Sequence, residues 1–430
     1  MRKLIAMLLC LCMLTSLCVV AASADDAEEL TVWCWDENFN IAAMNTAAEY
    51  YKAAGHDNFK LNVVNVSEED TQTRMITAFS AGVTEDLPDI VLMSDSAANQ
   101  FITNFEGCYA DLTDYFDWSE FAPYKVSCFT VDDRVYGVPF DSGSAGLFYR
   151  NDILEAAGYT AADLENITWW DLIEIAKDIQ AKTGKYGFQF DPSSGCAFTW
   201  IDSMLQASGT WFYDVNDENE DADFVNNAVV REMSEILKEM WNSGLVYGTD
   251  SRDSDGIGAI QRGDVAFVLN AIWYAPTLMA AEDASGLWSY ANVPTLTTID
   301  TSIYTNIGGS SWMVLSSSDN QELAIDFLKT VWAGNTDFYD EILLNQAAVA
   351  TWLPATESEA YQTPVAFFND SAIYADFASW GSEIPSIAYG TNTWVANGAI
   401  NSHLMEFFDD DYDLDGYLEA VQETYDITKN

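Results

Sequence analysis

Basic residues are scarce in this chain. It contains 17 Lys and Arg residues against 68 Asp and Glu residues, which gives a formal net charge of −51. Such a surface repels nucleic acid and anionic lipid head groups, so neither is expected as a partner. A ligand that carries phosphate, sulfate or carboxylate needs Arg or Lys in its pocket. The composition therefore favours a neutral ligand, and a cationic ligand such as a polyamine also remains open.

Histidine and cysteine are sparse as well. His56 and His403 are the only two histidines and lie far apart in the sequence, which leaves little for a zinc site or a Ser-His-Asp triad. Three of the seven cysteines fall within the first 24 residues, and the spacing of the other four fits no zinc pattern. Cys108 and Cys128 could form a disulfide, and the sequence leaves this open. No cofactor is expected.

The first residues have the pattern of an export signal. Arg2 and Lys3 precede an apolar stretch at 4–20, and the small residues ASA end the segment at Ala24. We expect a signal peptide at 1–24 with cleavage near Ala24. The mature protein should then be extracytoplasmic, which includes a secreted, periplasmic or envelope-associated state. No cysteine in this segment has the preceding leucine and small residues of a lipoprotein signal, so lipid anchoring stays the less favoured alternative.

The rest of the chain is too long for one ordinary core, and its 49% hydrophobic and 14% aromatic residues are not those of a disordered chain. Strand and helix patterns alternate at the start, which predicts an α/β fold with a largely parallel sheet covered on both faces. Strands are expected at 30–35, 61–66 and 89–93, with helices at 41–54, 71–81, 169–182, 226–243, 322–332, 395–408 and 417–425. Residues 212–224 are expected to form an acidic hairpin or loop.

Residues 131–152 contain a candidate hinge. A strand pattern ends at Pro139, a Gly/Ser-rich joint follows at 141–146, and a second strand pattern leads into a helix start at Asn151. Proline interrupts strand pairing and glycine permits unusual dihedral angles, so two folded parts can meet here and still bend. The alternative is an ordinary strand–loop–strand connection. The glycine-centred, strand-like segment at 306–314 is expected to be a second crossing.

Tryptophan is abundant, with 15 residues. Several lie at predicted strand ends or in loops, beside amides and carboxylates. Flat rings pack on the C–H faces of a sugar while polar side chains bind its hydroxyl groups, so this combination indicates carbohydrate binding. Core packing is the alternative for each ring taken singly. The tryptophans in such positions are Trp33, Trp35, Trp200, Trp211, Trp273, Trp352 and Trp394.

Two other patterns leave alternatives open. Paired carboxylates could serve a secreted glycoside hydrolase, although 68 acidic residues produce pairs by chance. The acidic run with Asp411, Asp413 and Asp415 matches the start of a calcium loop, but Gln422 stands at its twelfth position where Glu is expected. We interpret that run as an acidic turn before the last helix.

Five segments in one order carry a family resemblance. They are TVWCWDENFN, LPDIVLMSDS, RVYGVPFDSGSAGLFYRNDILEAAG followed by ITWWDLIEIAKDI, QRGDVAFVLNAIWYAP, and GGSSWMVLSSSDNQELAIDFLKTVWA. The chain resembles extracellular solute-binding protein family 1, the carbohydrate receptors of bacterial ABC importers. The resemblance implies a two-lobe periplasmic-binding-protein-like fold of the type II, venus-flytrap kind, with hinge crossings. Its first lobe would comprise 25–138 and 313–375, and its second lobe 139–312 and 376–430.

The resemblance also implies a function and a site. The protein would be a monomeric receptor, not an enzyme, that holds a neutral carbohydrate, most simply an oligosaccharide, between its lobes and delivers it to the permease subunits of an ABC transporter. The ligand-binding residues expected from the matching positions and the aromatic pattern are Trp35, Asp36, Asn38, Phe39, Asp95, Asp141, Ser142, Trp200, Trp273, Tyr274, Gly309, Ser310, Trp352, Tyr389 and Asn392.

Overall fold

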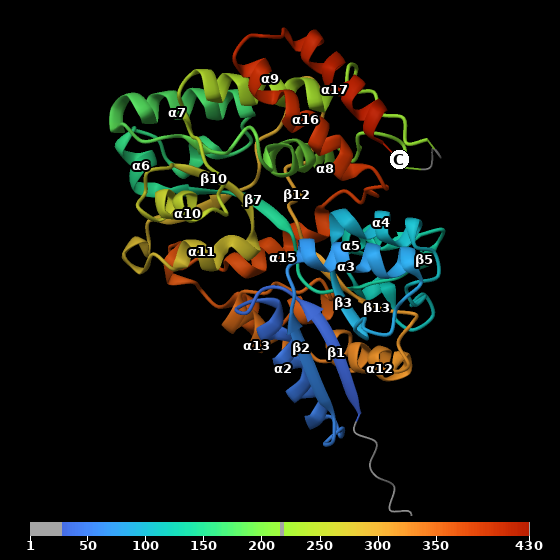
Figure 1. Cartoon of the computed structure of the whole chain (residues 1–430). Coiled ribbons are helices and arrows are strands. Elements are labelled where there is room, and N and C mark those ends of the chain that lie inside the picture. Colours follow the sequence, from blue (N-terminus) through green and yellow to red (C-terminus); the bar gives the residue numbers. More distant parts are fainter. Residues whose placement is uncertain (1–27, 216–218, 430) are drawn as a thin grey trace, which may run out of the picture.

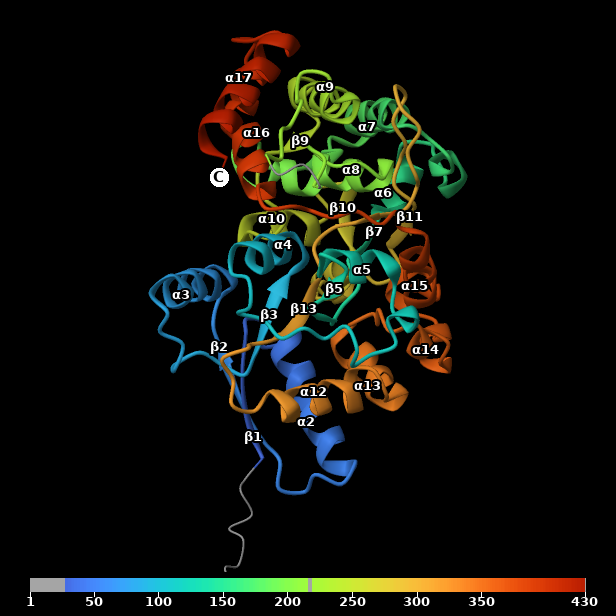
Figure 2. The same ribbon diagram turned by 90° about the vertical axis from the view of Figure 1, so that its right-hand side faces the viewer.

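The computed structural model describes residues 28–215 and 219–429. Figures 1 and 2 show two lobes, one above the other, with helices on the outside of each. The predicted signal peptide lies outside the described residues. Within those residues, every helix is too short or too polar to cross a membrane.

A five-stranded sheet forms the centre of the first lobe, in the order β2-β1-β3-β13-β6. β1 pairs in parallel with both β2 and β3, whereas β13 is antiparallel to β3 and to β6. Successive residues of β1 point to opposite faces of the sheet, so both faces need a cover of helices. The strands are β1 (Glu29–Cys34), β2 (Lys60–Asn65), β3 (Ile90–Ser94), β6 (Val138–Pro139) and β13 (Ser310–Val314).

Helices cover both faces of this sheet. α2 packs with α12 and α13, and α3 packs against β1 from the other side. The helices of this lobe are α2 (Asn40–Ala53), α3 (Glu68–Ala81), α4 (Asp95–Asn104), α5 (Pro123–Cys128), α12 (Gln321–Trp332), α13 (Thr336–Gln346), α14 (Leu353–Thr356) and α15 (Ile373–Glu383). A small hairpin joins β4 (Thr130–Val131) to β5 (Arg134–Val135).

A second sheet lies in the other lobe, and all its pairings are antiparallel. Its order is β10-β7-β11, and β12 pairs with the start of β7. The strands are β7 (Ser144–Arg150), β10 (Phe267–Ala271), β11 (Trp288–Ala291) and β12 (Thr305–Asn306), with β8 (Phe188–Gln189) and β9 (Val246–Tyr247) paired separately. The helices are α6 (Asn151–Ala156), α7 (Trp169–Thr183), α8 (Asp202–Ser208), α9 (Ala228–Asn242), α10 (Ser254–Gln261), α11 (Ala275–Met279), α16 (Thr393–Phe408) and α17 (Leu414–Thr428).

Short helical turns complete the elements. A π-helical turn at Ala197–Ile201 precedes α8 directly. The 3₁₀ turns are Trp118–Glu120, Ala161–Leu164, Ile272–Tyr274, Glu282–Ala284, Glu359–Gln362 and Ala366–Phe368.

The chain crosses between the two sheets at 140–143 and again at 307–309. β6 belongs to the first sheet and β7 to the second, while β12 belongs to the second and β13 to the first. Both predicted crossings are therefore present, side by side between the lobes (Figure 1). α15 packs against β7, where Phe377 stacks on Phe148 with ring centroids 5.6 Å apart.

Several sequence-based expectations need correction. Among the described strands, parallel pairing is confined to β2, β1 and β3 of the first lobe and to the short β8–β9 pair, because strand pairing depends on contacts that the order of elements does not specify. α3 begins at Glu68 rather than 71, since Ser67 caps it by accepting the Asp70 N–H. The described parts of 212–224, residues 212–215 and 219–224, contain no strand, which agrees with the loop alternative of that expectation. The predicted helices at 395–408 and 417–425 are confirmed and begin earlier.

The disulfide and the calcium loop are absent from the described residues. Cys108 and Cys128 are free thiols, as are the other two cysteines there. Across 28–215 and 219–429, no three acidic, histidine or cysteine side chains converge as a metal site would need. Asp413 instead caps α17 by accepting the Gly416 N–H at 2.9 Å, and Asp415 pairs with Arg231 at 2.8 Å. The run with Asp411, Asp413 and Asp415 therefore forms the acidic turn before the last helix that the sequence predicted.

Candidate functional site

A carboxylate joins the two crossings. Asp141, on the first crossing, accepts hydrogen bonds from the Ser310 N–H at 2.9 Å and the Ser310 O–H at 2.8 Å on the second. Both side chains are buried. Ser142 is fixed beside them, because its N–H donates to the Val349 carbonyl and its hydroxyl lies 3.1 Å from the Tyr124 hydroxyl. The crossings are therefore cross-linked by polar contacts that solvent does not reach.

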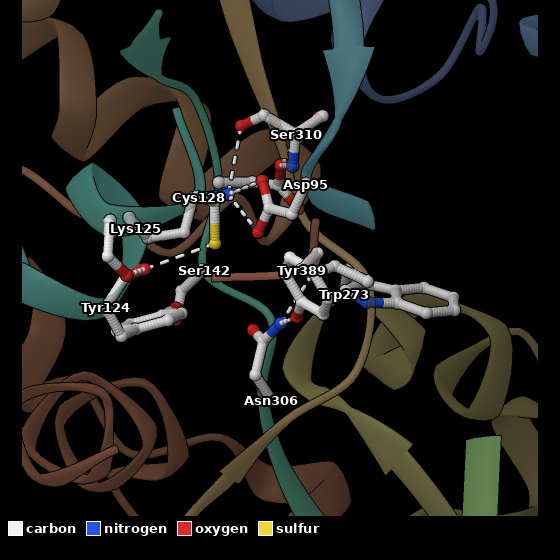
Figure 3. Close-up of polar contacts among 12 residues, drawn as sticks. Asp95, Tyr124, Lys125, Cys128, Ser142, Trp273, Asn306, Ser310 and Tyr389 are labelled. Atoms are coloured by element: carbon white, nitrogen blue, oxygen red, sulfur yellow. Dashed lines mark hydrogen bonds and ion pairs between the residues drawn. The ribbon is translucent and has the colours of Figure 1, made fainter. Parts of the chain in front are cut away.

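A buried lysine completes this hinge cluster, which we define as Asp95, Lys125, Asp141 and Ser310. The Lys125 ammonium lies 2.6 and 2.8 Å from the carboxylate oxygens of Asp95 and donates to the Ser310 carbonyl at 3.1 Å. Figure 3 shows these side chains converging from α4, α5 and β13. Burial raises the pKa of Asp95 to about 7, Lys125 opposes this rise, and the nearby Asp141 carboxylate adds to it.

The hinge cluster leaves room only for glycine at position 309. Its φ of +96° lies in the left-handed region that favours glycine, and a Cβ there would stand 2.7 Å from Asp95 Oδ2 and 2.8 Å from Lys125 Nζ. The structure thus brings together five predicted site residues, Asp95, Asp141, Ser142, Gly309 and Ser310, but in a buried cluster. Asp95, Asp141 and Ser310 contact one another or Lys125, while Ser142 contacts Tyr124 and Val349.

Four other predicted residues line an open hollow of about 620 Å³ between the lobes. Asp36, Asn38 and Phe39 come from the loop after β1, and Trp273 comes from the second lobe. The loop is shaped locally: the Asp36 carboxylate accepts the N–H groups of Asn38 and Phe39, which leaves these side chains at the surface. The rest of the lining consists of Pro276, Thr277, Met279, Ala280, Leu344, Asn345, Gln346, Ala347 and Tyr374.

Trp273 is held rigidly while part of its ring stays exposed. Its indole N–H donates to the Ile307 carbonyl at 2.9 Å, and Gly308 lies against the ring edge. Tyr274 stands perpendicular to it at 5.9 Å and is itself buried, with its hydroxyl donating to the Ser251 carbonyl at 2.6 Å. A fixed, flat, partly exposed ring that closes one wall of a hollow is suited to stacking on an apolar ligand face. Trp273 is also anchored to the second crossing, so lobe movement and the ring are linked.

Trp200 lines a second, much smaller hollow of about 20 Å³ in the second lobe. The ring itself is buried against Trp169 and Phe190 at 5.4 and 5.5 Å, so most of it is core. The polar lining, in contrast, was not predicted from the sequence. It consists of Gln189, Asp191, Ser194, Thr199, Asp250 and Ser251.

Arg252 stands at the edge of this smaller hollow. Its guanidinium grips Asp250 through two hydrogen bonds of 2.9 and 2.6 Å, and it lies beside Gly195. The hydrogen bonds to Asp250 raise the pKa of Arg252 above its ordinary value, and the negative charge of Glu68 on the first lobe adds to this rise. Because Asp250 neutralises it, Arg252 does not make this region cationic.

Trp394 belongs to the tryptophans that the sequence pattern indicated for carbohydrate binding, whereas its partner Phe198 was not predicted. Trp394, at the start of α16, is 42% exposed and stacks on Phe198 of the π-helical turn, with centroids 5.6 Å apart and planes at 15°. An exposed tryptophan is uncommon, whereas a buried one is expected. In the sequence, Trp394 stands out only by its position at the start of a helix. That position does not distinguish an exposed tryptophan from a tryptophan of the core.

The remaining predicted residues make structural contacts. Trp35 packs partly buried on the loop's inner side. Trp352 is buried, stacks on Tyr339 and donates to Glu120 at 3.2 Å. Tyr389 is buried in the second lobe, where its hydroxyl accepts from Asn306 and donates to Gln206. Asn392 donates to the buried Glu220 carboxylate.

Comparisons with known proteins match this architecture. The family model described as bacterial extracellular solute-binding protein matches residues 45–337. A lactose-binding protein of Rhizobium radiobacter is 38% identical over 390 residues, which are 91% of this chain and 90% of that protein. An arabinooligosaccharide-binding protein of Bacillus subtilis (strain 168) is 22% identical over 94% of both chains.

Solved structures show the same fold. The ABC transporter associated binding protein from B. animalis subsp. lactis Bl-04, in complex with β-1,6-galactobiose, superposes with a TM-score of 0.73 at 23% identity and covers 93% of this chain and 96% of its own. The galacto-N-biose-/lacto-N-biose I-binding protein from Bifidobacterium longum gives a TM-score of 0.72 at 19% identity, with coverage of 93% and 96%. Two lobes that enclose a ligand site are thus the shared architecture.

Proposed function

The chain belongs to the bacterial extracellular solute-binding protein family, and on this premise we propose that it is the receptor of an ABC importer that holds a neutral oligosaccharide between its lobes. The receptor acts outside the cytoplasm as a monomer and delivers its ligand to membrane permease subunits. The relatives are sugar-binding transport proteins, which supports a receptor rather than a glycoside hydrolase.

One observation carries the carbohydrate proposal: aromatic rings from both lobes line one open hollow together with uncharged polar groups. Phe39 contributes from the first lobe and Trp273 from the second, with Asn38 and Asn345 beside them. Rings bind the C–H faces of a sugar and amides bind its hydroxyl groups. No lysine or arginine is among the described residues that line this hollow, and Asp36 is its one charged group, which supports a neutral ligand over an anionic one.

Closure follows from the same arrangement. A ligand that contacts Phe39 and Trp273 together binds the closed form better than the open form. To move a mostly open population to a mostly closed one, this preference has to reach roughly 10⁴-fold, or about 5.5 kcal/mol. Two stacked rings and a few buried hydrogen bonds are enough for that. We propose 140–143 and 307–309 as the hinge.

We further propose that the sugar contains galactose. The 38% identical relative is a lactose-binding protein, and two structural neighbours hold β-1,6-galactobiose and lacto-N-biose. A thermal-shift screen of lactose, β-1,6-galactobiose, lacto-N-biose, arabinooligosaccharides, maltooligosaccharides, spermidine and Ca²⁺ tests this. A ligand at 100 times its Kd adds about 2.7 kcal/mol to the unfolding free energy. A shift with the galactosides alone supports the proposal, and a shift with spermidine alone refutes it. New reducing ends after incubation with an oligosaccharide would instead show a hydrolase.

A further inference from the structure

One face of α16 is attached to the π-helical turn through three contacts. The participating residues of α16 are separated by three and four positions, so they lie on the same side of the helix. The π-helical turn and the first residue of α8 provide the partners. Turns of this type are often found at functional sites. The contacts are Trp394 stacked on Phe198, Asn397 Nδ2 donating to Asp202 Oδ2 at 2.8 Å, and the Ala197 N–H donating to Asn401 Oδ1 at 3.1 Å.

The contact between Asp202 and Asn397 leaves one oxygen of each side chain without a hydrogen-bond partner among the described residues. Asp202 is 6% exposed and forms no ion pair within the described residues. Asp202 Oδ1 and Asn397 Oδ1 are both buried, and neither has a hydrogen-bond donor among the described residues. A buried carboxylate without a cation, next to a second unsatisfied acceptor, is strongly disfavoured.

We infer that Asp202 carries a proton in the folded protein and that its Oδ1–H donates to Asn397 Oδ1. A carboxylic acid and a primary amide can join through two hydrogen bonds, one in each direction. The bond from Asn397 Nδ2 is one of the two, and the added proton supplies the donor that both orphaned oxygens lack. The neutral pair then holds the π-helical turn to α16, so Asp202 is a positioning residue for the Phe198–Trp394 aromatic pair.

The surroundings favour the neutral acid. Burial raises the pKa of Asp202 well above its ordinary value, and the Asn397 hydrogen bond opposes this rise. Tyr389 is a titratable group close enough to interact with Asp202, and it also interacts with Cys128 and Asp95. Glu232, on the neighbouring α9, accepts hydrogen bonds from Thr297 and Thr298. None of these groups is a cation that would stabilise an ionised Asp202.

An infrared spectrum tests the inference on the ligand-free protein. At about pH 9, far above the ordinary pKa of a carboxyl group, the wild type is expected to retain the carbonyl band of a protonated carboxylic acid, shifted in D₂O. Asp202→Asn should remove that band. Asp57→Asn, which changes an exposed carboxylate in the loop between α2 and β2, should leave it. Absence of the band from the wild type, or its survival in Asp202→Asn, overturns the inference.

Thermal and urea unfolding across pH give a second readout. Because the folded protein binds a proton that the unfolded chain releases, its folding constant should fall by up to about tenfold for each pH unit between the ordinary carboxyl pKa and the raised one. Asp202→Asn keeps an amide pair in the same place and should lose this part of the slope. Asn397→Leu, which removes the partner, should shift the infrared band if the variant folds. An unchanged slope in Asp202→Asn contradicts a neutral Asp202.

A positioning role has its own readout, which rests on the proposed function. Affinity for lactose or β-1,6-galactobiose should stay level up to about pH 9 in the wild type and fall above it, where Asp202 loses its proton, and it should stay level throughout in Asp202→Asn. If neither sugar binds but the infrared band is present, the proposed ligand fails and the protonated pair stands. If the sugars bind with the same pH profile in both proteins, the positioning role is refuted.

Discussion

Lys125 places its ammonium nitrogen 2.6 and 2.8 Å from the two carboxylate oxygens of Asp95, and solvent reaches at most 1% of either side chain. Asp141 lies close enough to raise the pKa of Asp95, so a single cation serves two buried acids. This relationship ties the fold of the first lobe to both crossings, because Lys125 and Asp141 also hold Ser310. The two crossings are therefore joined by a buried ion pair and its hydrogen bonds.

Removal of the lysine should be costly. Lys125→Met leaves the Asp95 and Asp141 carboxylates buried without a cation, and breaking one side of such a pair costs about 3–5 kcal/mol. Urea unfolding measures the loss. The double variant Lys125→Met with Asp95→Leu removes both charges of the pair and should recover much of it. A loss below about 1 kcal/mol in Lys125→Met would contradict the account of the hinge cluster.

The hinge cluster should also give the stability a pH dependence in the neutral range. Burial raises the pKa of Asp95 to about 7 and raises that of Asp141 as well. A raised carboxyl pKa means that the folded state binds the proton more tightly than the unfolded chain. The corresponding stability is complete below the ordinary value of 3.8 and is lost as pH rises to about 7.

Asp95→Asn isolates this effect. Between about pH 4 and pH 7 the unfolding free energy of the wild type should fall relative to that of Asp95→Asn, by at most about 1.4 kcal/mol per pH unit for one proton. The groups with lowered pKa values, such as Asp264 and Glu232, act in the opposite direction and at lower pH. Parallel curves for the two proteins would show that Asp95 does not take up the proton.

Gly309→Ala should destabilise the protein more than the replacement of another glycine with a left-handed backbone does. The new Cβ would meet Asp95 Oδ2 and Lys125 Nζ below 3.0 Å, and the φ of +96° adds backbone strain. Gly82→Ala is the matched control, since Gly82 has a φ of +64° and nothing within 4 Å. The control should lose about 1 kcal/mol, and Gly309→Ala distinctly more. Equal losses in chemical unfolding would mean that the hinge cluster yields to an added methyl group.

Trp394→Ala should weaken sugar binding with little effect on folding. Its ring is 42% exposed. The loss of one stacking contact with a sugar costs about 1.4 kcal/mol of binding free energy, which corresponds to a tenfold rise in Kd. Phe198, on which Trp394 stacks, directly precedes Thr199 and Trp200 of the smaller hollow. Tyr115→Ala removes a 48% exposed ring on the first lobe whose chain neighbours line neither hollow, so it should bind as the wild type does. Fluorescence titration compares the three proteins. Unchanged affinity in Trp394→Ala would place this ring outside the ligand site.

The strands and helices near the start of the chain could be predicted because their apolar residues follow local periods. β1 and β3 are buried runs, and α2 repeats its buried residues at helical spacing. Lys125 could not be found in that way. A lysine within a six-residue helix resembles a surface residue, and its burial depends on Asp95 and Ser310, which are 30 and 185 positions away.

The predicted site residues fall into two groups, those that reach the open hollow and those that are buried, and contacts distant in the sequence decide between them. Asp36, Asn38 and Trp273 follow strand ends in the sequence, and strand ends are where the lobes face each other, so the pattern led to the hollow. Asp95 and Asp141 follow strands too, but the crossings close over them. Only the packing of α5 and β13 determines whether such a carboxylate faces a ligand or a buried ammonium.

Isothermal titration of the ligand-free protein with β-1,6-galactobiose and lactose, repeated with Trp273→Ala, tests the central claim most directly. The account predicts saturable one-to-one binding to the wild type, at least about a 100-fold weaker Kd in Trp273→Ala (about 2.7 kcal/mol), and only a modest loss of stability, because this ring is partly exposed. Binding that survives unchanged in Trp273→Ala, or saturation by spermidine with no heat from any neutral sugar, would contradict it.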